Sequence, residues 1–154
     1  MNPEKVKFRQ AILQDLNKIV NLLADDELGT VREDTSVPLN QAYFSAFDAI
    51  KKDPNNQLIV AVSADKIAGI LQLTFIPNLS YKGRWRAHIE AVRIHKNFRS
   101  LGLGQQIIQH AVDLARKKNC HLVQLTSNKS REKAIDFYRK LGFVDSHEGF
   151  KYPL

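Results

Sequence analysis

Apolar residues follow two different spacings along this chain of 154 residues. Spacings of three and four residues put apolar side chains on one face of a helix, whereas short β-branched runs favour strands. The helical spacing predicts helices over residues 13–23, 39–52, 103–118 and 134–141. The apolar runs predict strands over residues 6–9, 58–62, 67–75, 87–95 and 122–125, and one bent strand or short hairpin over 143–153. The order βααβββαβαβ, with one more strand allowed at the end, predicts an α/β protein.

Turn-forming residues separate these elements. Residues 24–38 contain Gly29, Pro38 and several charges, so they predict a loop between the first two helices. Gly142 follows the last helical stripe and predicts a helix cap. No repeat, low-complexity tract or linker interrupts the pattern. We therefore expect one domain over residues 1–154.

The most informative segment joins the strand that ends near Ile94 to the third predicted helix. It reads Arg99-Ser100-Leu101-Gly102-Leu103-Gly104. Glycines let the backbone turn sharply and come close to a ligand. The first amides of the following helix lack internal partners and lie at the positive end of the helix dipole. The segment therefore predicts a pyrophosphate site, with a plain glycine-rich turn as the alternative.

Two common nucleotide-binding motifs do not fit this segment. The dinucleotide fingerprint needs a third glycine at the position of Ile107, and the P-loop needs Gly-Lys-Ser/Thr, which is absent here. The pattern that remains is Arg-x-x-Gly-x-Gly between a strand and a helix.

This pattern and a second motif resemble the GNAT superfamily of acetyl-CoA-dependent N-acetyltransferases. The second motif runs from Ala134 to Phe143 and is similar to the family's Ala-x-x-Phe/Leu-Tyr-x-x-x-Gly-Phe. The resemblance covers most of the chain and implies the GNAT fold, with a mixed central sheet flanked by helices. Asn128, Arg131 and Ser146-His147 resemble aminoalkylphosphonate N-acetyltransferases, and His88-Ile89-Glu90 resembles glucosamine-6-phosphate N-acetyltransferases.

The resemblance also implies a co-substrate, acetyl-CoA, and the residues that bind it. They belong to the central strand, the glycine turn and the last helix with the segment before it. They are Val92, Arg93, Ile94, Arg99, Ser100, Leu101, Gly102, Leu103, Gly104, Asn128, Arg131 and Phe137. Many family members carry Asn where Arg131 stands, and Pro where Lys96 stands.

The charge distribution agrees with a polyanionic ligand. The formal net charge is +7, and residues 82–140 hold 14 of the 23 Lys and Arg but only 4 of the 16 Asp and Glu. A basic half raises the alternative of nucleic-acid binding, but no aromatic interleaving or known binding motif accompanies it. CoA, which carries a pyrophosphate and a ribose 3′-phosphate, explains the asymmetry more economically, and we expect no nucleic acid partner.

Acetyl transfer to an alkyl amine first requires removal of a proton. An alkyl amine has a lysine-like pKa of ~10.4 and is protonated at pH 7, so forming the free amine costs about 4 to 5 kcal/mol. Glu90 is the candidate base, since it lies on the predicted central strand among apolar residues, where burial would favour proton uptake. The resemblance supports a glutamate here that acts through a water. The alternative is a partly exposed carboxylate paired with His88 or an arginine.

The leaving thiolate needs an acid, and the carbonyl oxygen needs a hydrogen-bond donor. The resemblance assigns the acid to Tyr138, although its place beside Phe137 also suits a core residue with a satisfied hydroxyl. The resemblance further implies a bulge near Val92, which frees a strand amide for the carbonyl oxygen. His88 and His95 are more typical of strand-end positions than of catalysts, and no His, Cys and carboxylate set has metal-ligand spacing.

The predicted loop between the first two helices is acidic. Its carboxylates are Asp25, Asp26, Glu27, Glu33 and Asp34. In the GNAT fold this loop borders the acceptor side of the cleft, so we expect it to lie opposite the basic half and attract a cationic amine. A solvated acidic loop is the alternative. Arg32 is the one local residue suited to an anionic group such as phosphate or phosphonate.

These observations predict an N-acetyltransferase that moves an acetyl group from acetyl-CoA to a primary amine of a small molecule, by direct transfer in a ternary complex. A protein N-terminus or lysine is the alternative acceptor, and a non-catalytic CoA-binding or nucleic-acid-associated regulatory module is the alternative class. No apolar run approaches the ~18 residues of a membrane span, and the start shows no signal-peptide pattern. With Cys120 as the single cysteine, we expect a cytoplasmic protein without a metal, and a homodimer is allowed.

Overall fold

The computed structural model describes residues 6–154 and contains one five-stranded sheet in the order β1-β2-β3-β4-β5. Its strands are β1 (Lys7–Gln10), β2 (Asn56–Ser63), β3 (Lys66–Ile76), β4 (Arg86–Ile94) and β5 (Leu122–Leu125). The first four strands pair antiparallel, and β4 pairs parallel with β5. The expected mixed sheet of an α/β protein is therefore confirmed.

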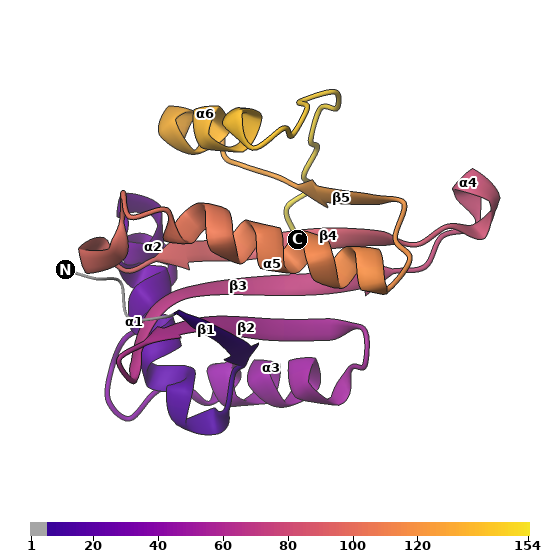
Figure 1. Cartoon of the computed structure of the whole chain (residues 1–154). Coiled ribbons are helices and arrows are strands. Elements are labelled where there is room, and N and C mark those ends of the chain that lie inside the picture. Colours follow the sequence, from indigo (N-terminus) through magenta and orange to yellow (C-terminus); the bar gives the residue numbers. More distant parts are fainter. Residues whose placement is uncertain (1–5) are drawn as a thin grey trace.

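Helices cover both faces of this sheet (Figure 1). They are α1 (Leu16–Ala24), α2 (Glu27–Arg32), α3 (Gln41–Lys52), α4 (Ser80–Gly83), α5 (Leu103–Lys117) and α6 (Glu132–Lys140), with single 3-10 turns at Leu13–Asp15 and Lys96–Phe98. The segment α4 is a tight turn rather than a regular helix, because Tyr81 and Lys82 have φ values of 52° and 60°.

The period-two pattern of the strands divides the core between the two faces. Ile59 and Ala61 of β2 pack with Ile107 and Ala111 of α5 on one face. Val60, between them in the sequence, packs with α1 on the other face. Each of these side chains is at most 1% exposed, and burying one aliphatic side chain of this size contributes about 1.5 to 3 kcal/mol. The alternation thus fixes which residues face α5 and which face α1.

Two predictions of secondary structure from the sequence are wrong. Residues 24–38, expected as a loop, include helix α2, because the side chain of Asp26 accepts a hydrogen bond from the backbone N–H of Gly29 and caps the helix. The expected strand or hairpin over residues 143–153 is absent from the described chain, and Phe150, Tyr152 and Leu154 are exposed. Alternation of apolar residues gives only strand propensity, whereas a strand also needs a backbone partner.

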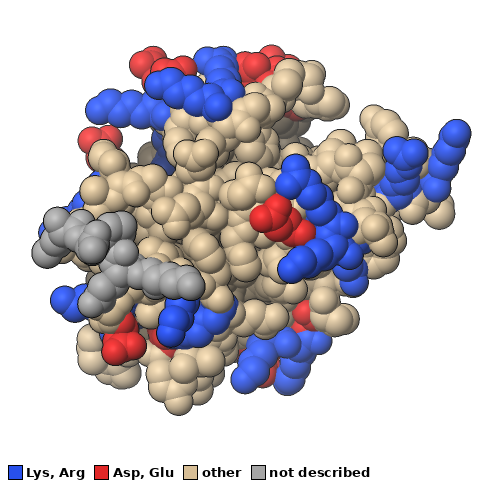
Figure 2. Space-filling view, in the orientation of Figure 1, with Lys and Arg blue, Asp and Glu red and all other residues tan. Residues whose placement is uncertain are grey.

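Charged side chains lie in separate groups on the face seen in Figure 2. Lys and Arg gather over α6 and around α4, with Asp and Glu among the former. On this face they form no continuous basic band. No helix in residues 6–154 has the length and apolar character needed to cross a membrane.

Candidate active site

The central strand β4 parts from β5 at a bulge. Pairing with β5 stops at Ile89 and Leu125, although β4 continues to Ile94. On its other side, Glu90 lies opposite Gln72 but Arg93 lies opposite Ile70, so two residues of β4 face one residue of β3. Ala91, within this bulge, has a φ of 55°. The bulge expected near Val92 is confirmed, and it leaves the following backbone groups of β4 without pairing to β5.

The bulge also changes which face of the sheet the residues of β4 occupy. Glu90 and Arg93 are an odd number of positions apart, so a regular strand would place them on opposite faces. Because their partners Gln72 and Ile70 lie two residues apart on β3, the extra residue brings Glu90 and Arg93 to the same face. Val92 and Ile94 instead pack with the α5 side of the core.

The glycine turn leads directly into α5. Gly102 precedes the helix with a φ of +79°, in the left-handed region that favours glycine. The first hydrogen bond of the helix runs from the Gln106 N–H to the Gly102 carbonyl, at 3.1 Å. The amides of Leu103, Gly104 and Gln105 therefore precede the helical hydrogen-bond ladder and lie at its positive end. This arrangement suits a phosphate group.

Gly104 has a further role that the sequence did not reveal. A β-carbon at this position would lie 3.1 Å from Cζ of Phe137 and 3.9 Å from Cγ1 of Ile94. Glycine therefore allows α6 to pack closely against the start of α5. Phe137, expected to contact the cofactor, fills this space between the two helices.

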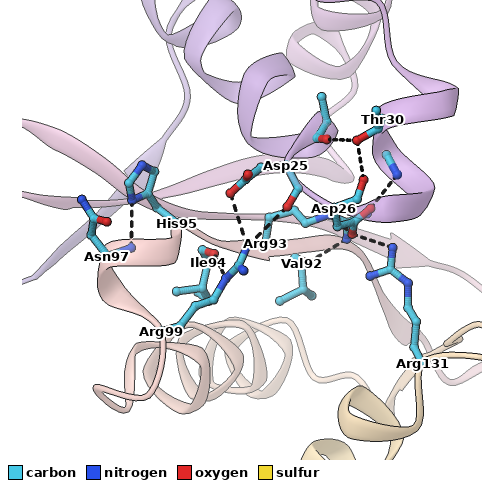
Figure 3. Close-up of polar contacts among 12 residues, drawn as sticks. Asp25, Asp26, Thr30, Val92, Arg93, Ile94, His95, Asn97, Arg99 and Arg131 are labelled. Carbon is cyan, nitrogen blue, oxygen red and sulfur yellow. Dashed lines mark hydrogen bonds and ion pairs between the residues drawn. The ribbon is translucent and has the colours of Figure 1, made fainter.

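Arg99 is turned back toward β4 and the end of α1 (Figure 3). Its Nε donates to the carbonyl of Ile94 at 3.0 Å, and its Nη2 lies 3.4 Å from both Oδ2 and the carbonyl oxygen of Asp25. Arg99 thereby ties the glycine turn to the junction of α1 and α2. Ser100 has a φ of 61°, and Leu101 is exposed, whereas the side chain of Leu103 is buried in the core.

Asp26 bridges two arginines from distant parts of the chain (Figure 3). Its Oδ2 accepts a hydrogen bond from Nη2 of Arg131 at 2.6 Å and lies 3.3 Å from Nε of Arg93. Burial disfavours the ionised carboxylate, but the Gly29 N–H and the two arginines outweigh it, so the pKa of Asp26 lies below its usual value. For Arg93 burial dominates, and its pKa is lowered despite the carboxylate.

This pairing corrects the expected position of the acidic loop. Asp25 and Asp26 do not lie opposite the basic half but form ion pairs with Arg99, Arg93 and Arg131, which belong to it. Two other carboxylates of the loop have local partners, since Glu33 accepts from the hydroxyl of Tyr43 and Asp34 from the Ser36 N–H. The loop therefore offers fewer free carboxylates to a cationic acceptor than its composition suggests.

Tyr138 lies on α6 beside the two arginines. Its ring makes edge contacts with Phe137 and Phe143, at centroid distances of 5.3 and 5.8 Å. Burial raises the pKa of Tyr138, and the positive charges of Arg93 and Arg131 oppose that effect only in part. Among residues 6–154, none hydrogen-bonds the hydroxyl. Tyr138 therefore holds its proton at neutral pH and has a hydroxyl free to donate it.

Glu90 lies in solvent rather than in an apolar environment. Its side chain is 57% exposed, and its Oε1 lies 3.8 Å from Nε2 of His88. The expected desolvation is therefore wrong, because Glu90 points to the face opposite Ile89, Val92 and Ile94. Exposure and the proximity of His88 match the alternative reading from the sequence, and they still allow proton uptake through a water.

Asn128 organises the turn before α6. Its Oδ1 accepts hydrogen bonds from the N–H and the hydroxyl of Ser130, at 3.0 and 2.8 Å, and its carbonyl accepts from the N–H of Arg131. These contacts position Arg131 at the beginning of the helix. Among the described residues, no three His, Cys, Asp or Glu side chains come together as a metal site requires.

The fold and the site together define the class of protein. The sequence profile of the acetyltransferase (GNAT) family matches residues 17–143, and the chain belongs to this family. A solved structure described as a transcriptional regulator from Bacillus halodurans C-125 is 48% identical, with a TM-score of 0.94 over 97% of this chain and 100% of that one.

Two characterised relatives resemble the chain less closely. Glucosamine 6-phosphate N-acetyltransferase of Trypanosoma brucei brucei is 37% identical over 78 residues, which are 51% of this chain and only about half (51%) of that protein. Aminoalkylphosphonate N-acetyltransferase of Salmonella typhimurium is 27% identical over 74% of this chain and 73% of that protein. The resemblance to these two sub-families that the sequence motifs indicated is confirmed.

Proposed function

We propose that this chain transfers the acetyl group of acetyl-CoA to a primary amine of a small molecule while both substrates are bound. The observation that carries the proposal is the separation of β4 from β5 beyond Ile89 and Leu125, which leaves an unpaired strand edge near Tyr138. The thioester of acetyl-CoA supplies the activated acetyl group. Membership of the GNAT family and the names of the two relatives support this chemistry.

The glycine turn and the strand edge are the proposed binding surfaces for acetyl-CoA. The amides of Leu103 and Gly104, with those of the turn before them, hold the pyrophosphate. The backbone of residues 92–94 is free of β5 and pairs with the pantetheine arm, which directs the thioester toward Tyr138. Both surfaces consist of backbone groups, and on the strand edge the carbonyls of Val92 and Ile94 already accept hydrogen bonds from Arg93 and Arg99.

Three groups carry out the proton transfers and stabilise the developing charge. Glu90 takes one proton from the protonated amine through a water, which allows the nitrogen to bond to the carbonyl carbon. The second proton leaves the nitrogen for solvent through the same water as the tetrahedral intermediate collapses. The N–H of Val92 donates to the carbonyl oxygen as negative charge develops there. As the carbon–sulfur bond breaks, the Tyr138 hydroxyl protonates the sulfur, and solvent restores its proton. The products are an N-acetyl amine and CoA with a free thiol.

A second candidate is a CoA-binding regulatory module without turnover. The description of the Bacillus halodurans structure as a transcriptional regulator favours it. A nucleic-acid surface usually presents a basic patch or stripe. The basic side chains on the face seen in Figure 2 instead lie in separate groups with carboxylates among them, so they give the regulatory module no support there. A protein N-terminus or lysine is the alternative acceptor within the acetyltransferase class.

Release of CoA thiol tests the proposal. The protein is incubated with acetyl-CoA and a panel of small primary amines, peptides with free N-termini and lysine peptides, and each rate is compared with that lacking an amine. We expect amine-dependent release with one or more small amines, greatly reduced in Tyr138→Phe. Tight binding of acetyl-CoA without acetylation of any panel member would favour the regulatory module.

A further inference from the structure

The surroundings of Asp26 contain more positive charge than one carboxylate neutralises. Arg93 and Arg131 both direct nitrogen atoms at its Oδ2. Arg32 ends the six-residue helix α2 that Asp26 caps, and its charge acts on Arg93. Three guanidinium groups and one carboxylate give the cluster a formal charge of +2. We call Arg32, Arg93, Arg131 and Asp26 the arginine cluster.

Most hydrogen-bond donors of the two inner arginines are unused. A guanidinium carries five N–H groups. Within the described residues, Arg93 donates one hydrogen bond, from Nη1 to the Val92 carbonyl, and its buried Nε makes none despite lying 3.3 Å from Asp26. Arg131 donates one, to Asp26. Their side chains are only 19% and 28% exposed, so water replaces the missing partners incompletely.

The arginine cluster is separate from the proposed pyrophosphate site. Arg93 points to the α1 face of the sheet, since it lies opposite Ile70, which packs with α1. A β-carbon on Gly104 would lie 3.9 Å from Ile94, whose side chain faces α5. The bulge places Glu90 on the same face as Arg93, and Tyr138 is within the electrostatic reach of Arg93 and Arg131. The cluster therefore lies where an acceptor would meet the proposed base and acid.

We propose that the arginine cluster binds a phosphate or phosphonate group carried by the acceptor amine. The inference rests on the proposed acetyl transfer and specifies its acceptor. A phosphoryl dianion matches the excess charge of +2, and its three oxygens match the fork geometry of guanidinium groups. Asp26 holds Arg93 and Arg131 in position before the acceptor arrives, which lowers the entropic cost of binding.

Binding of an anion without an amine tests the site independently of turnover. The probe is methylphosphonate, titrated into protein saturated with CoA so that the pyrophosphate site is filled, and followed by calorimetry. We expect saturable binding that Arg131→Gln or Arg32→Gln weakens about tenfold or more. Arg139→Gln, on the same helix as Tyr138 but paired with Asp136 and Asp145 at the surface, is the matched control and should bind as the parent does.

Asp26→Asn separates an anion site from a purely structural ion pair. Asparagine keeps one oxygen for the Gly29 N–H but loses the second oxygen, which Arg131 and Arg93 share, and it removes one negative charge. The gain in net positive charge should outweigh the lost positioning of the arginines, so methylphosphonate should bind at least as tightly as to the parent. A loss of affinity in Asp26→Asn as large as in Arg131→Gln would overturn the proposal. Absence of methylphosphonate binding to the parent protein, or weaker CoA binding in Arg131→Gln with unchanged methylphosphonate affinity, would overturn it as well.

Kinetics then identify the anion. Values of kcat/KM are compared for 2-aminoethylphosphonate, 3-aminopropanoate and ethylamine, which share an amine but carry a dianion, a monoanion and no anion. We expect the phosphonate to be preferred by tenfold or more over either, and Arg131→Gln to erase that preference. Equal rates for all three would refute the arginine cluster as an acceptor site yet leave acetyl transfer standing. Phosphonate binding without any acetylation would refute the proposed function instead.

Discussion

Phe137 of α6 occupies the space that a side chain on Gly104 of α5 would need, since a β-carbon there would lie 3.1 Å from Cζ of Phe137. Residue 104 must therefore be small for two reasons. The proposed pyrophosphate has to reach the backbone amides, and α6 has to pack closely against α5. The two can be separated by mutation.

We expect Gly104→Val to abolish acetyl-CoA binding, because the branched side chain blocks the amides and displaces Phe137. Gly104→Ala should weaken binding less. Phe137→Leu in the Gly104→Ala background makes room for the new methyl group, so any affinity it restores measures the contribution of packing. Calorimetry with acetyl-CoA and circular dichroism would follow both properties. A folded Gly104→Val protein with the affinity of the parent would refute the phosphate site.

Tyr138→Phe should lower kcat by about 100-fold or more with little change in acetyl-CoA affinity, since only the proton donor is removed. The ring contacts with Phe137 and Phe143 remain. The raised pKa of Tyr138 gives the sign of the pH dependence. The Tyr138 hydroxyl therefore keeps its proton up to its ordinary pKa of 10.0 and beyond. Its deprotonation should lower the rate only above that pH. Steady-state kinetics in which Tyr138→Phe matches the parent would remove Tyr138 from the mechanism.

Glu90→Gln should lower kcat and flatten the fall in rate on the acidic side of the profile, because glutamine cannot take the amine proton. His88→Gln is the matched variant, since His88 lies 3.8 Å from Glu90 and is the other titratable group there. The pH profile of kcat/KM would be compared for both variants. Flattening by His88→Gln alone would transfer the role of base from Glu90 to His88.

Asp15 provides a test of stability away from the site. It is 6% exposed and accepts two hydrogen bonds from Arg9, at 2.6 and 3.0 Å, and one from the Ile12 N–H. Burial opposes ionisation, but these partners outweigh it and lower the pKa of Asp15 below 3.8. The stabilisation should therefore be complete above that pH and disappear as pH falls through the lowered value.

Replacing the carboxylate makes this measurable. Asp15→Asn should reduce the free energy of unfolding at pH 7 by about 1 to 3 kcal/mol. Asp48→Asn, which breaks an exposed pair with Lys52, should cost less than about 0.5 kcal/mol and serves as the control. Urea denaturation at pH 7 and below pH 3 would measure both. A cost for Asp15→Asn that persists unchanged at the lower pH would contradict the role of its charge.

The features of this protein that the sequence predicts correctly follow from the spacing of neighbouring residues or from complete family motifs. The glycine turn before α5 follows from the spacing of Gly102 and Gly104, and the bulge near Val92 is implied by the resemblance to the GNAT family. The sequence predicts a loop in place of helix α2, because Gly29, Pro38 and several charges interrupt the apolar spacing. The signal was nevertheless present, since Asp26 caps the helix and Arg32 lies at its end with the favourable charge.

The remaining features depend on contacts between distant residues. Asp26 and Arg131 are 105 positions apart, so no local pattern pairs them. The sequence therefore predicts that the acidic loop lies opposite the arginines, whereas in the structure the loop contacts them. The same limitation explains Glu90, which was expected to be buried because its neighbours along the strand are apolar. Strand alternation from the buried Ile89 places Glu90 on the other face of the sheet, where its side chain is 57% exposed.

Direct observation of the transferred group is the strongest test of the account. The protein is mixed with acetyl-CoA labelled with ¹³C at the acetyl carbonyl and with 2-aminoethylphosphonate, and the label is followed by NMR while CoA thiol is titrated. The account predicts that an N-acetyl amide signal appears in amounts equal to the thiol released, and that Tyr138→Phe slows both together. Thiol release accompanied only by free labelled acetate, or no release with any amine in the panel, would contradict it.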